Sequence, residues 1–185
     1  MHPGISLDVD VAGSDGIVRK IVEDEAEIGI IFSPPSEQRI VTLHASRQPL
    51  YAVMSPRHEF ARRKTVSLRH LAGHAVAMLA ATQGVRQTID QVSQHERVTI
   101  EPRFTCNSTL ALKAFPDRYG AVTILPLFAV MSELDAGRLA ALPLADKGFR
   151  TTRVELIARR GRDVSLAARK LAEALHGRMA SFKRT

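Results

Sequence analysis

The opening of the chain alternates between strand-like and helix-like patterns, and this order constrains the fold more than any other feature. Residues Ile5–Val11 alternate apolar and polar side chains, which is the period of a half-buried strand. Residues 15–25 carry apolar side chains at helical spacing, and Ala26–Phe32 is a mostly apolar run that stops before two prolines. A strand, a helix and a second strand in this order predict parallel strands whose faces are covered by helices.

The rest of the chain continues this alternation. We expect strands at 40–44, 50–54, 75–79, 98–104, 119–125, 139–144 and 151–158, and helices at 67–71, 82–93, 107–115, 127–134 and 165–179. Pro116 is expected to end the helix that begins at Asn107 or Ser108, and Ser165 is expected to cap the last helix. The order predicts an α/β protein with two parallel-rich sheets. In such sheets a ligand lies beyond the carboxyl ends of the strands, near helix N-termini.

Composition restricts the class of protein. The 185 residues suffice for one domain or for two small lobes, and an aromatic fraction of 5% without Trp predicts an aliphatic core. The net charge is +7, but the basic residues are dispersed, which is typical of a solvated surface. Cys106 is the single cysteine, so an intrachain disulfide is impossible and a reducing cytoplasm is expected. We expect no signal peptide, because the N-terminus lacks a basic region followed by a long apolar run, and no membrane span, because no run approaches ~18 consecutive apolar residues.

The sequence predicts no catalytic residues, no metal site and no cofactor. The seven His residues show no zinc-binding spacing, and neither a Gly-x-Ser-x-Gly elbow nor a phosphate loop occurs. Strand ends and helix starts offer better candidates for ligand contact, because free backbone N–H groups there favour an anion. These candidates are Ser33, Pro34, Thr82, Gln83, Gly84, Arg86, Thr105, Asn107, Ser108, Leu125 and Pro126. Each could equally cap a helix, and Arg86 could bind a carboxylate or be a surface arginine.

Several phrases, in order, resemble the effector-binding domain of LysR-type transcription regulators over nearly the whole chain. They are 2–9, 28–32 (with Glu27 where the family usually has Asp), 50–56, 58–61 (with Glu59 where proline is usual), 66–72, 119–126, 137–139 and 156–160. Each phrase is weak alone, but the order and spacing of the set are specific.

The resemblance implies a two-lobed fold of the periplasmic-binding-protein type II, with two parallel-rich mixed sheets joined by two crossovers. Lobe I would comprise 1–54 plus 128–185 and lobe II 55–127, with crossovers near Ser55 and Pro126. The ligand candidates would line the cleft between the lobes. The function implied is a ligand-sensing regulatory domain, in which a small effector, expected to be an organic anion, biases the orientation of the lobes.

The resemblance also implies partners. Two copies of the domain would pair, the full-length protein would be a cytoplasmic tetramer, and DNA would be bound only through an N-terminal winged helix-turn-helix that this sequence lacks. That module, a linker helix, and the first strand and helix of the domain itself would precede His2.

Two other functions remain open at this stage. A stand-alone solute-binding protein of the same fold is less favoured, because the phrases at 50–61 and 66–72 resemble the regulators. An enzyme similar to prephenate dehydratase would need a Thr-Arg-Phe-type motif, and Arg103-Phe104-Thr105 has related residues in a different order.

Overall fold

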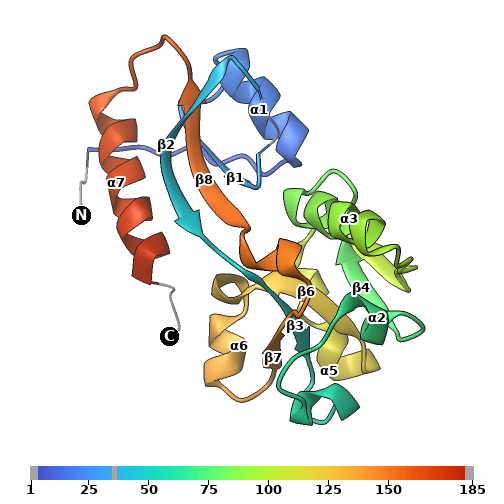
Figure 1. Ribbon diagram of the computed structural model, residues 1–185. Coiled ribbons are helices and arrows are strands. Elements are labelled where there is room, and N and C mark those ends of the chain that lie inside the picture. The colour runs from blue at the N-terminus through green and yellow to red at the C-terminus, as the bar shows by residue number, and fades with distance from the viewer. Residues whose placement is uncertain (1–3, 35–36, 182–185) are drawn as a thin grey trace. The chain divides into compact units, whose positions relative to one another are not determined.

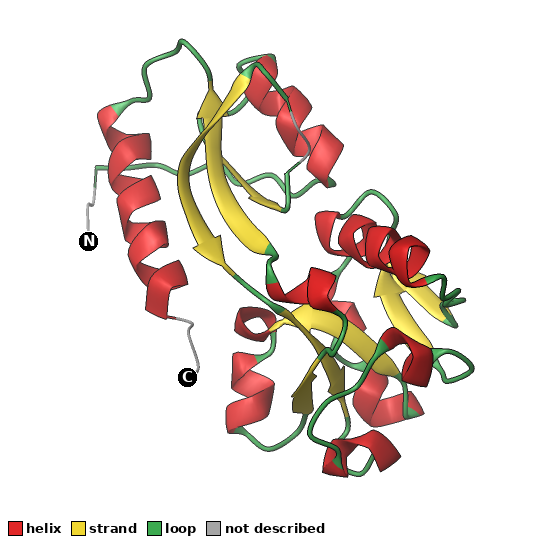
Figure 2. Cartoon of the chain, in the orientation of Figure 1, coloured by secondary structure: helices red, strands yellow, loops and turns green. Residues whose placement is uncertain are grey.

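The computed structural model describes residues 4–34 and 37–181, which form two compact units (Figures 1 and 2). The first unit contains the chain up to Ser46 and again from Val154, and the second contains Arg47–Arg153. The chain therefore leaves the first unit after Ser46 and returns after Arg153. The sequence placed these crossings near Ser55 and Pro126. The boundaries differ because 50–54 and 140–143 are strands of the second unit's sheet.

The first unit is a small sheet between two helices. Its elements are α1 (Ser14–Val22), β1 (Gly29–Phe32), β2 (Ile40–Arg47), β8 (Arg153–Arg159) and α7 (Leu166–Ser181). The strand order is β1-β8-β2, and β1 runs antiparallel to β8 with Ile30 opposite Leu156. The parallel pairing predicted for the start of the chain is therefore wrong for β1, whose partner comes from the far end of the sequence.

Each face of this sheet packs against one helix, as Figure 1 shows for α1 and α7. Ile31 and Ile157 face α1, where they bury Val18 and Ile21. Leu156 is the next residue along β8 and joins Val154 and Ala172 of α7 in a cluster on the other face. Because successive side chains of a strand point to opposite faces, one strand serves both cores.

The segment Ile5–Val11 is not a strand, although its alternation predicted one. Residues 5–13 belong to neither a helix nor a strand. Leu7, Val9 and Val11 are 58%, 77% and 83% exposed. Alternation specifies which side chains a strand would bury, but a strand also needs a hydrogen-bonding neighbour, and residues 5–13 pair with none of the named strands.

The second unit is built on a five-stranded mixed sheet. Its strands are β3 (Leu50–Met54), β4 (Val76–Leu79), β5 (Phe104–Cys106), β6 (Val122–Pro126) and β7 (Ala140–Pro143). Their order is β5-β4-β6-β3-β7. Strands β5, β4 and β6 run parallel, whereas β3 is antiparallel to both β6 and β7.

Short helices surround this sheet. They are η1 (Glu59–Arg62), α2 (Leu68–Leu71), α3 (Gly84–Glu96), α4 (Thr109–Leu112), α5 (Phe115–Tyr119), η2 (Leu127–Ala129), α6 (Met131–Asp135) and η3 (Lys147–Arg150). The core is aliphatic as predicted, with fully buried Met54, Leu71, Ile89 and Ile124, and Phe149 as its one fully buried aromatic side chain among the described residues.

Two local predictions in this unit are wrong. The strand expected at 98–104 reduces to 104–106, because α3 extends to Glu96 and Arg97 ends it in a left-handed conformation with φ 54°. The helix expected at 107–115 divides into α4 and α5. Pro116 lies in the first turn of α5 and so begins a helix, since that turn needs no N–H from proline.

Candidate functional site

The candidate site of the second unit is the edge of its sheet where three parallel strands end. Leu79 of β4 lies opposite Cys106 of β5, and the Ala80 amide donates to the Cys106 carbonyl at 2.7 Å. Strand β6 runs parallel to β4 on its other side. The carboxyl ends of β5, β4 and β6 therefore meet at one edge, and the segments after them converge there.

The N-terminus of α3 opens on this edge. The Gln83 amide donates to the Ala80 carbonyl at 2.9 Å, which closes the turn that contains Thr82. Gln83 occupies the N-cap position but its side chain makes no capping hydrogen bond, and the first turn contains no acidic residue. Gly84 is the first, buried residue of the helix. Helices leave their first N–H groups without intrahelical partners, so this end favours an anion.

Arg86 is held in a fixed position in the first turn of α3. Its Nε donates to Oδ1 of Asp90 at 2.8 Å, and its Nη1 lies 3.4 Å from the Leu79 carbonyl. The side chain is only 17% exposed, so Arg86 is not an ordinary surface arginine. Sequence reasoning missed Asp90, although its distance of four residues along a helix was a usable signal.

The segment after β5 brings a second set of polar groups. Thr105 lies in β5, and both it and Asn107 are exposed. The Ser108 hydroxyl accepts a hydrogen bond from the Ala111 amide at 3.3 Å and thereby caps α4. The Cys106 thiol donates to the Ser108 carbonyl at 3.2 Å. Thr105 and Asn107 are thus the most exposed members of this set.

The remaining four candidates either have buried side chains or belong to the first unit. Pro126 ends β6 at the same edge, but the side chains of Leu125 and Pro126 are buried, with Pro126 opposite Leu50 of β3. Ser33 and Pro34 belong to the first unit, where they follow β1, and Ser33 has a positive φ of 46°. The second unit therefore gathers the candidates of α3, β5 and β6 at one edge, while this pair occupies a strand end of the first unit.

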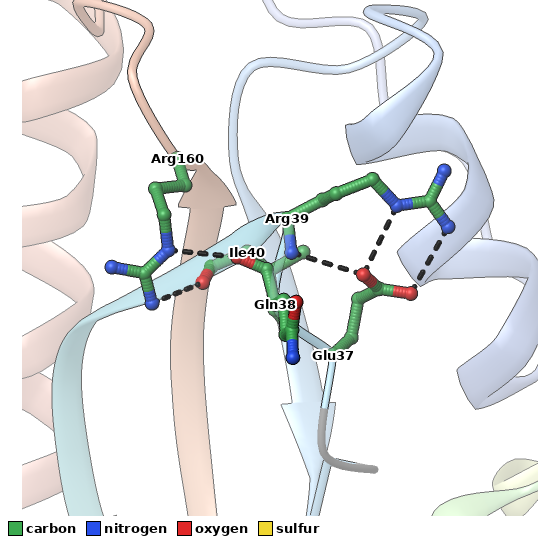
Figure 3. A network of polar contacts seen from close by, with 5 residues as sticks. All are labelled: Glu37, Gln38, Arg39, Ile40 and Arg160. Atoms are coloured by element: carbon green, nitrogen blue, oxygen red, sulfur yellow. Dashed lines mark hydrogen bonds and ion pairs between the residues drawn. The ribbon is translucent and has the colours of Figure 1, made fainter.

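A separate polar network lies in the first unit, and the sequence did not predict it (Figure 3). The Arg39 guanidinium donates to both carboxylate oxygens of Glu37 at 3.0 Å, and these bonds lower the pKa of Glu37 to about 2. Arg160 donates to the carbonyls of Gln38 and Ile40 at 2.8 and 3.1 Å. Glu37 and Arg39 also border a hollow of about 290 Å³ beside Val18 and other residues of α1. The network fixes the start of β2 to the end of β8.

In the part of the chain that the structure describes, His, Cys, Asp and Glu side chains do not gather in threes that could hold a metal ion. Among residues 4–34 and 37–181, no helix combines the length and the apolar character needed to cross a bilayer.

Comparison with known proteins places the chain in a family. The family model described as LysR substrate binding domain matches residues 1–180. The HTH-type transcriptional activator CmpR of Synechocystis sp. is 24% identical over 80% of this chain and 48% of its own length. The SDS degradation transcriptional activation protein of a Pseudomonas sp. is 26% identical over 95% of this chain and 57% of its length. The chain thus spans about half the length of the curated relatives that it matches.

Solved structures confirm the two-lobed α/β fold that the resemblance implied. The regulatory domain of CcmR from Synechocystis PCC6803, solved in complex with 2-PG, gives a TM-score of 0.80 at 18% identity, over 98% of this chain and 86% of that one. The effector-binding domain of QuiR, solved with shikimate, gives a TM-score of 0.74 at 17% identity, over 92% and 79% of the two chains. The chain therefore belongs to the LysR substrate binding domain family.

Proposed function

We propose that this chain is the effector-sensing part of a LysR-type transcription regulator and that its second unit binds a small organic anion. The anion would lie at the sheet edge formed by β5, β4 and β6. The Arg86 guanidinium and the backbone N–H groups at the start of α3 would hold its charge. The exposed side chains of Thr105 and Asn107 would contact its polar groups.

The observation that carries this proposal is the combination of Arg86 with an uncapped helix. Arg86 is mostly buried, is held by Asp90, and lies in a first turn that contains no acidic residue. Arg86 places its charge beside the positive end of the helix, so both would attract an anionic ligand in addition to the Asp90 carboxylate that the Arg86 Nε contacts at 2.8 Å. The related structures of CcmR with 2-PG and of QuiR with shikimate support a small anionic ligand.

The other functions considered from the sequence are less favoured. A stand-alone solute-binding protein has the same fold, but the family model and the curated relatives are those of transcription regulators. The relatives are regulators and not enzymes, which also disfavours the dehydratase-like alternative.

The partners follow from the same relatives and are part of the proposal. CmpR is an HTH-type activator, and the match covers 48% of its length, so DNA would be bound by a helix-turn-helix module outside the matched region. Two copies of the domain would pair, and the full-length protein would be a tetramer in the cytoplasm, where its DNA lies. Ser33 and Pro34 stay predicted effector contacts in the first unit.

The test is a titration of the ¹⁵N-labelled chain with a panel of small carboxylates and phosphate esters that includes shikimate. Binding at the proposed edge would shift the amide signals of Gly84, Val85 and Arg86 more than those of β7. The Arg86→Ala variant should weaken that binding by about tenfold or more, as expected for loss of one charge-assisted hydrogen bond.

Arg138→Ala is the matched control. Arg138 is an exposed arginine that precedes β7, at the opposite edge of the sheet from the site, with a side chain 61% exposed. The Arg138→Ala variant should bind the same ligands as tightly as the wild type does. Equal binding by wild type and Arg86→Ala, or shifts confined to other elements, would place the ligand elsewhere.

A further inference from the structure

Three histidines gather around one buried ring in the second unit, away from the proposed effector site. Phe60 is 3% exposed. Its ring centroid lies 5.0 Å from that of His58, 4.7 Å from that of His74 and 6.2 Å from that of His70. The cluster joins η1, α2 and the loop before β4, which together form the segment 58–74.

Two of these histidines accept hydrogen bonds that start helices. Nδ1 of His58 accepts from the Phe60 amide at 3.1 Å, which caps η1. Nδ1 of His70 accepts from the Ser67 amide at 3.1 Å and lies 2.9 Å from the Ser67 hydroxyl. An imidazole nitrogen accepts only when it carries no proton, whereas both nitrogens of a protonated ring are donors. The hydrogen bonds at both helix starts therefore require that Nδ1 of His58 and Nδ1 of His70 carry no proton.

The third histidine is constrained differently. Nε2 of His74 lies 3.3 Å from a carboxylate oxygen of Glu59, and its Nδ1 is buried without a hydrogen-bond partner. Protonation of Nδ1 would create a buried N–H without an acceptor, which is costly. The ring of His74 also lies 6.3 Å from the ring of His58.

Two basic and two acidic groups surround the cluster. The Arg63 guanidinium lies 4.9 Å over the Phe60 ring. Arg69 of α2 donates to the Glu96 carbonyl. The acids are Glu59, which contacts His74, and Asp146, which accepts from the Leu68 amide at the start of α2. The neighbouring strand β7 has the sequence Ala-Ala-Leu-Pro and contributes no titratable side chain.

We propose that the segment 58–74 is an acid-sensitive element of the regulatory domain, ordered while His58 and His70 are neutral and loosened when they take up protons. Each proton would convert an Nδ1 acceptor into a donor that faces a backbone N–H. The start of η1 and the start of α2 would each lose one capping hydrogen bond. Added positive charge beside the Arg63 guanidinium would favour the same opening.

The sign of the effect follows from His58. Burial lowers the pKa of His58, and His74 lowers it further, while Glu59 acts in the opposite direction. Because its pKa is lower in the folded than in the unfolded chain, folding disfavours the proton. The order of the segment is therefore complete above the usual pKa of histidine and is lost as the pH falls through the lowered value.

The experiment measures amide hydrogen exchange by NMR at about pH 7.5 and about pH 5.5, which bracket the ordinary titration of imidazole. Protection factors of Phe60, Ser67 and Leu71 in the wild-type chain should fall about fivefold to tenfold at the lower pH, the equivalent of losing one helix cap. Protection factors of Val76–Leu79 should not change, because β4 lies outside the segment.

The test is completed by variants in which an amide oxygen replaces the histidine Nδ1 as the hydrogen-bond acceptor, because an amide does not take up a proton in this pH range. His58→Asn retains a capping oxygen, and His70→Gln retains the Ser-x-x-Gln form of a capping box. In the double variant the protection factors of Phe60, Ser67 and Leu71 should no longer depend on pH. In the single variant His70→Gln, the protection factor of the Ser67 amide should no longer depend on pH. His95→Gln, on the exposed end of α3, should behave like the wild type. The proposal fails if wild-type protection does not fall in acid, or if the double variant loses as much protection as the wild type.

Discussion

Glu27 caps a helix that begins far along the chain. Its carboxylate accepts from the Ser165 amide at 3.1 Å and from the Ser165 hydroxyl at 3.2 Å. That hydroxyl in turn accepts from the Ala168 amide at 3.2 Å in the first turn of α7. The acid just before β1 therefore fixes the start of the last helix, and its negative charge suits the positive end of that helix.

Removing this cap should destabilise the first unit. Ser165→Ala and Glu27→Ala should each lower the free energy of unfolding by about 1 kcal/mol, the usual effect of a lost N-cap. Because both side chains serve one helix end, the double variant should lose less than the sum of the single losses. Urea unfolding followed by circular dichroism measures all three. Glu173→Ala, at an exposed position of α7, should change little, and strictly additive losses would contradict the shared cap.

Gly148 in η3 leaves room for a neighbouring helix. A Cβ atom at this position would lie 2.6 Å from Cγ2 of Val92 in α3. Gly148→Ala should therefore destabilise the second unit by about 1–3 kcal/mol, the range for overpacked sites. Val92→Ala in the same chain should recover part of that loss, because it removes the methyl group that collides. Thermal unfolding of the single and double variants would reveal the recovery. If Val92→Ala instead added its full loss to that of Gly148→Ala, steric contact would not be the cause.

Lys113, which follows α4, forms a half-buried ion pair with Glu133 of α6. Nζ of Lys113 lies 3.0 Å from Oε1 of Glu133, and the two side chains are 16% and 14% exposed. Burial acts to raise the pKa of Glu133, but hydrogen bonds from Lys113 and Ser132 outweigh it, and the pKa is lowered overall. A carboxylate with a lowered pKa stabilises the fold above its unfolded pKa and loses that effect as the pH falls through the folded value.

Glu133→Gln should thus be less stable than the wild type by about 1 kcal/mol at neutral pH. The difference should shrink as the pH falls below about 4, the ordinary range of a carboxyl group. Urea midpoints at several pH values would measure this convergence. Glu101→Gln, at an exposed position of the same unit, should show no comparable trend, and a gap for Glu133→Gln that stays constant into acid would contradict the ion pair as its source.

Local patterns predicted much of the fold, because their causes lie within a few residues. Ser165 caps α7 as expected, and β3 has the predicted bounds Leu50–Met54. The pairing of β1 with β8 depends on residues more than a hundred positions apart, which periodicity cannot identify. Ile5–Val11 has the alternation of a strand but pairs with none of the named strands, so the alternation predicted a strand that the structure does not contain.

The candidate site shows the same division. The rule that ligands lie at the carboxyl ends of parallel strands indicated Thr82, Arg86 and Thr105 as candidates, and the structure gathers them at one edge of the sheet. Burial was not predictable at that level, since Leu125 ends its strand with a side chain only 1% exposed. The orientation of Arg86 depends on Asp90 and on the carbonyl of Leu79 in β4. Every residue has a backbone carbonyl, so the sequence does not indicate which carbonyl accepts a hydrogen bond from Arg86.

Asp90 should be the residue that positions Arg86 at the proposed site. Its carboxylate is the nearer of the two hydrogen-bond acceptors of the guanidinium, at 2.8 Å against 3.4 Å for the Leu79 carbonyl. Asp90→Ala should raise the hydrogen-exchange rate of the Arg86 Nε–H about fivefold to tenfold, as expected for loss of a charge-assisted bond worth about 1 kcal/mol. Global stability should fall by only about 0.5 kcal/mol, the usual value of such a pair on a helix.

The arginine Nε region of a ¹H–¹⁵N spectrum reports this rate without any ligand. Asp90→Asn should give an intermediate rate, because the amide oxygen still accepts but carries no charge. The Nε–H of exposed Arg138 provides the control signal within the same spectrum. If the Arg86 rate is the same in wild type and Asp90→Ala, the Leu79 carbonyl alone orients the guanidinium. Asp90 would then have no positioning role, and the backbone at the end of β4 would fix the direction of the guanidinium.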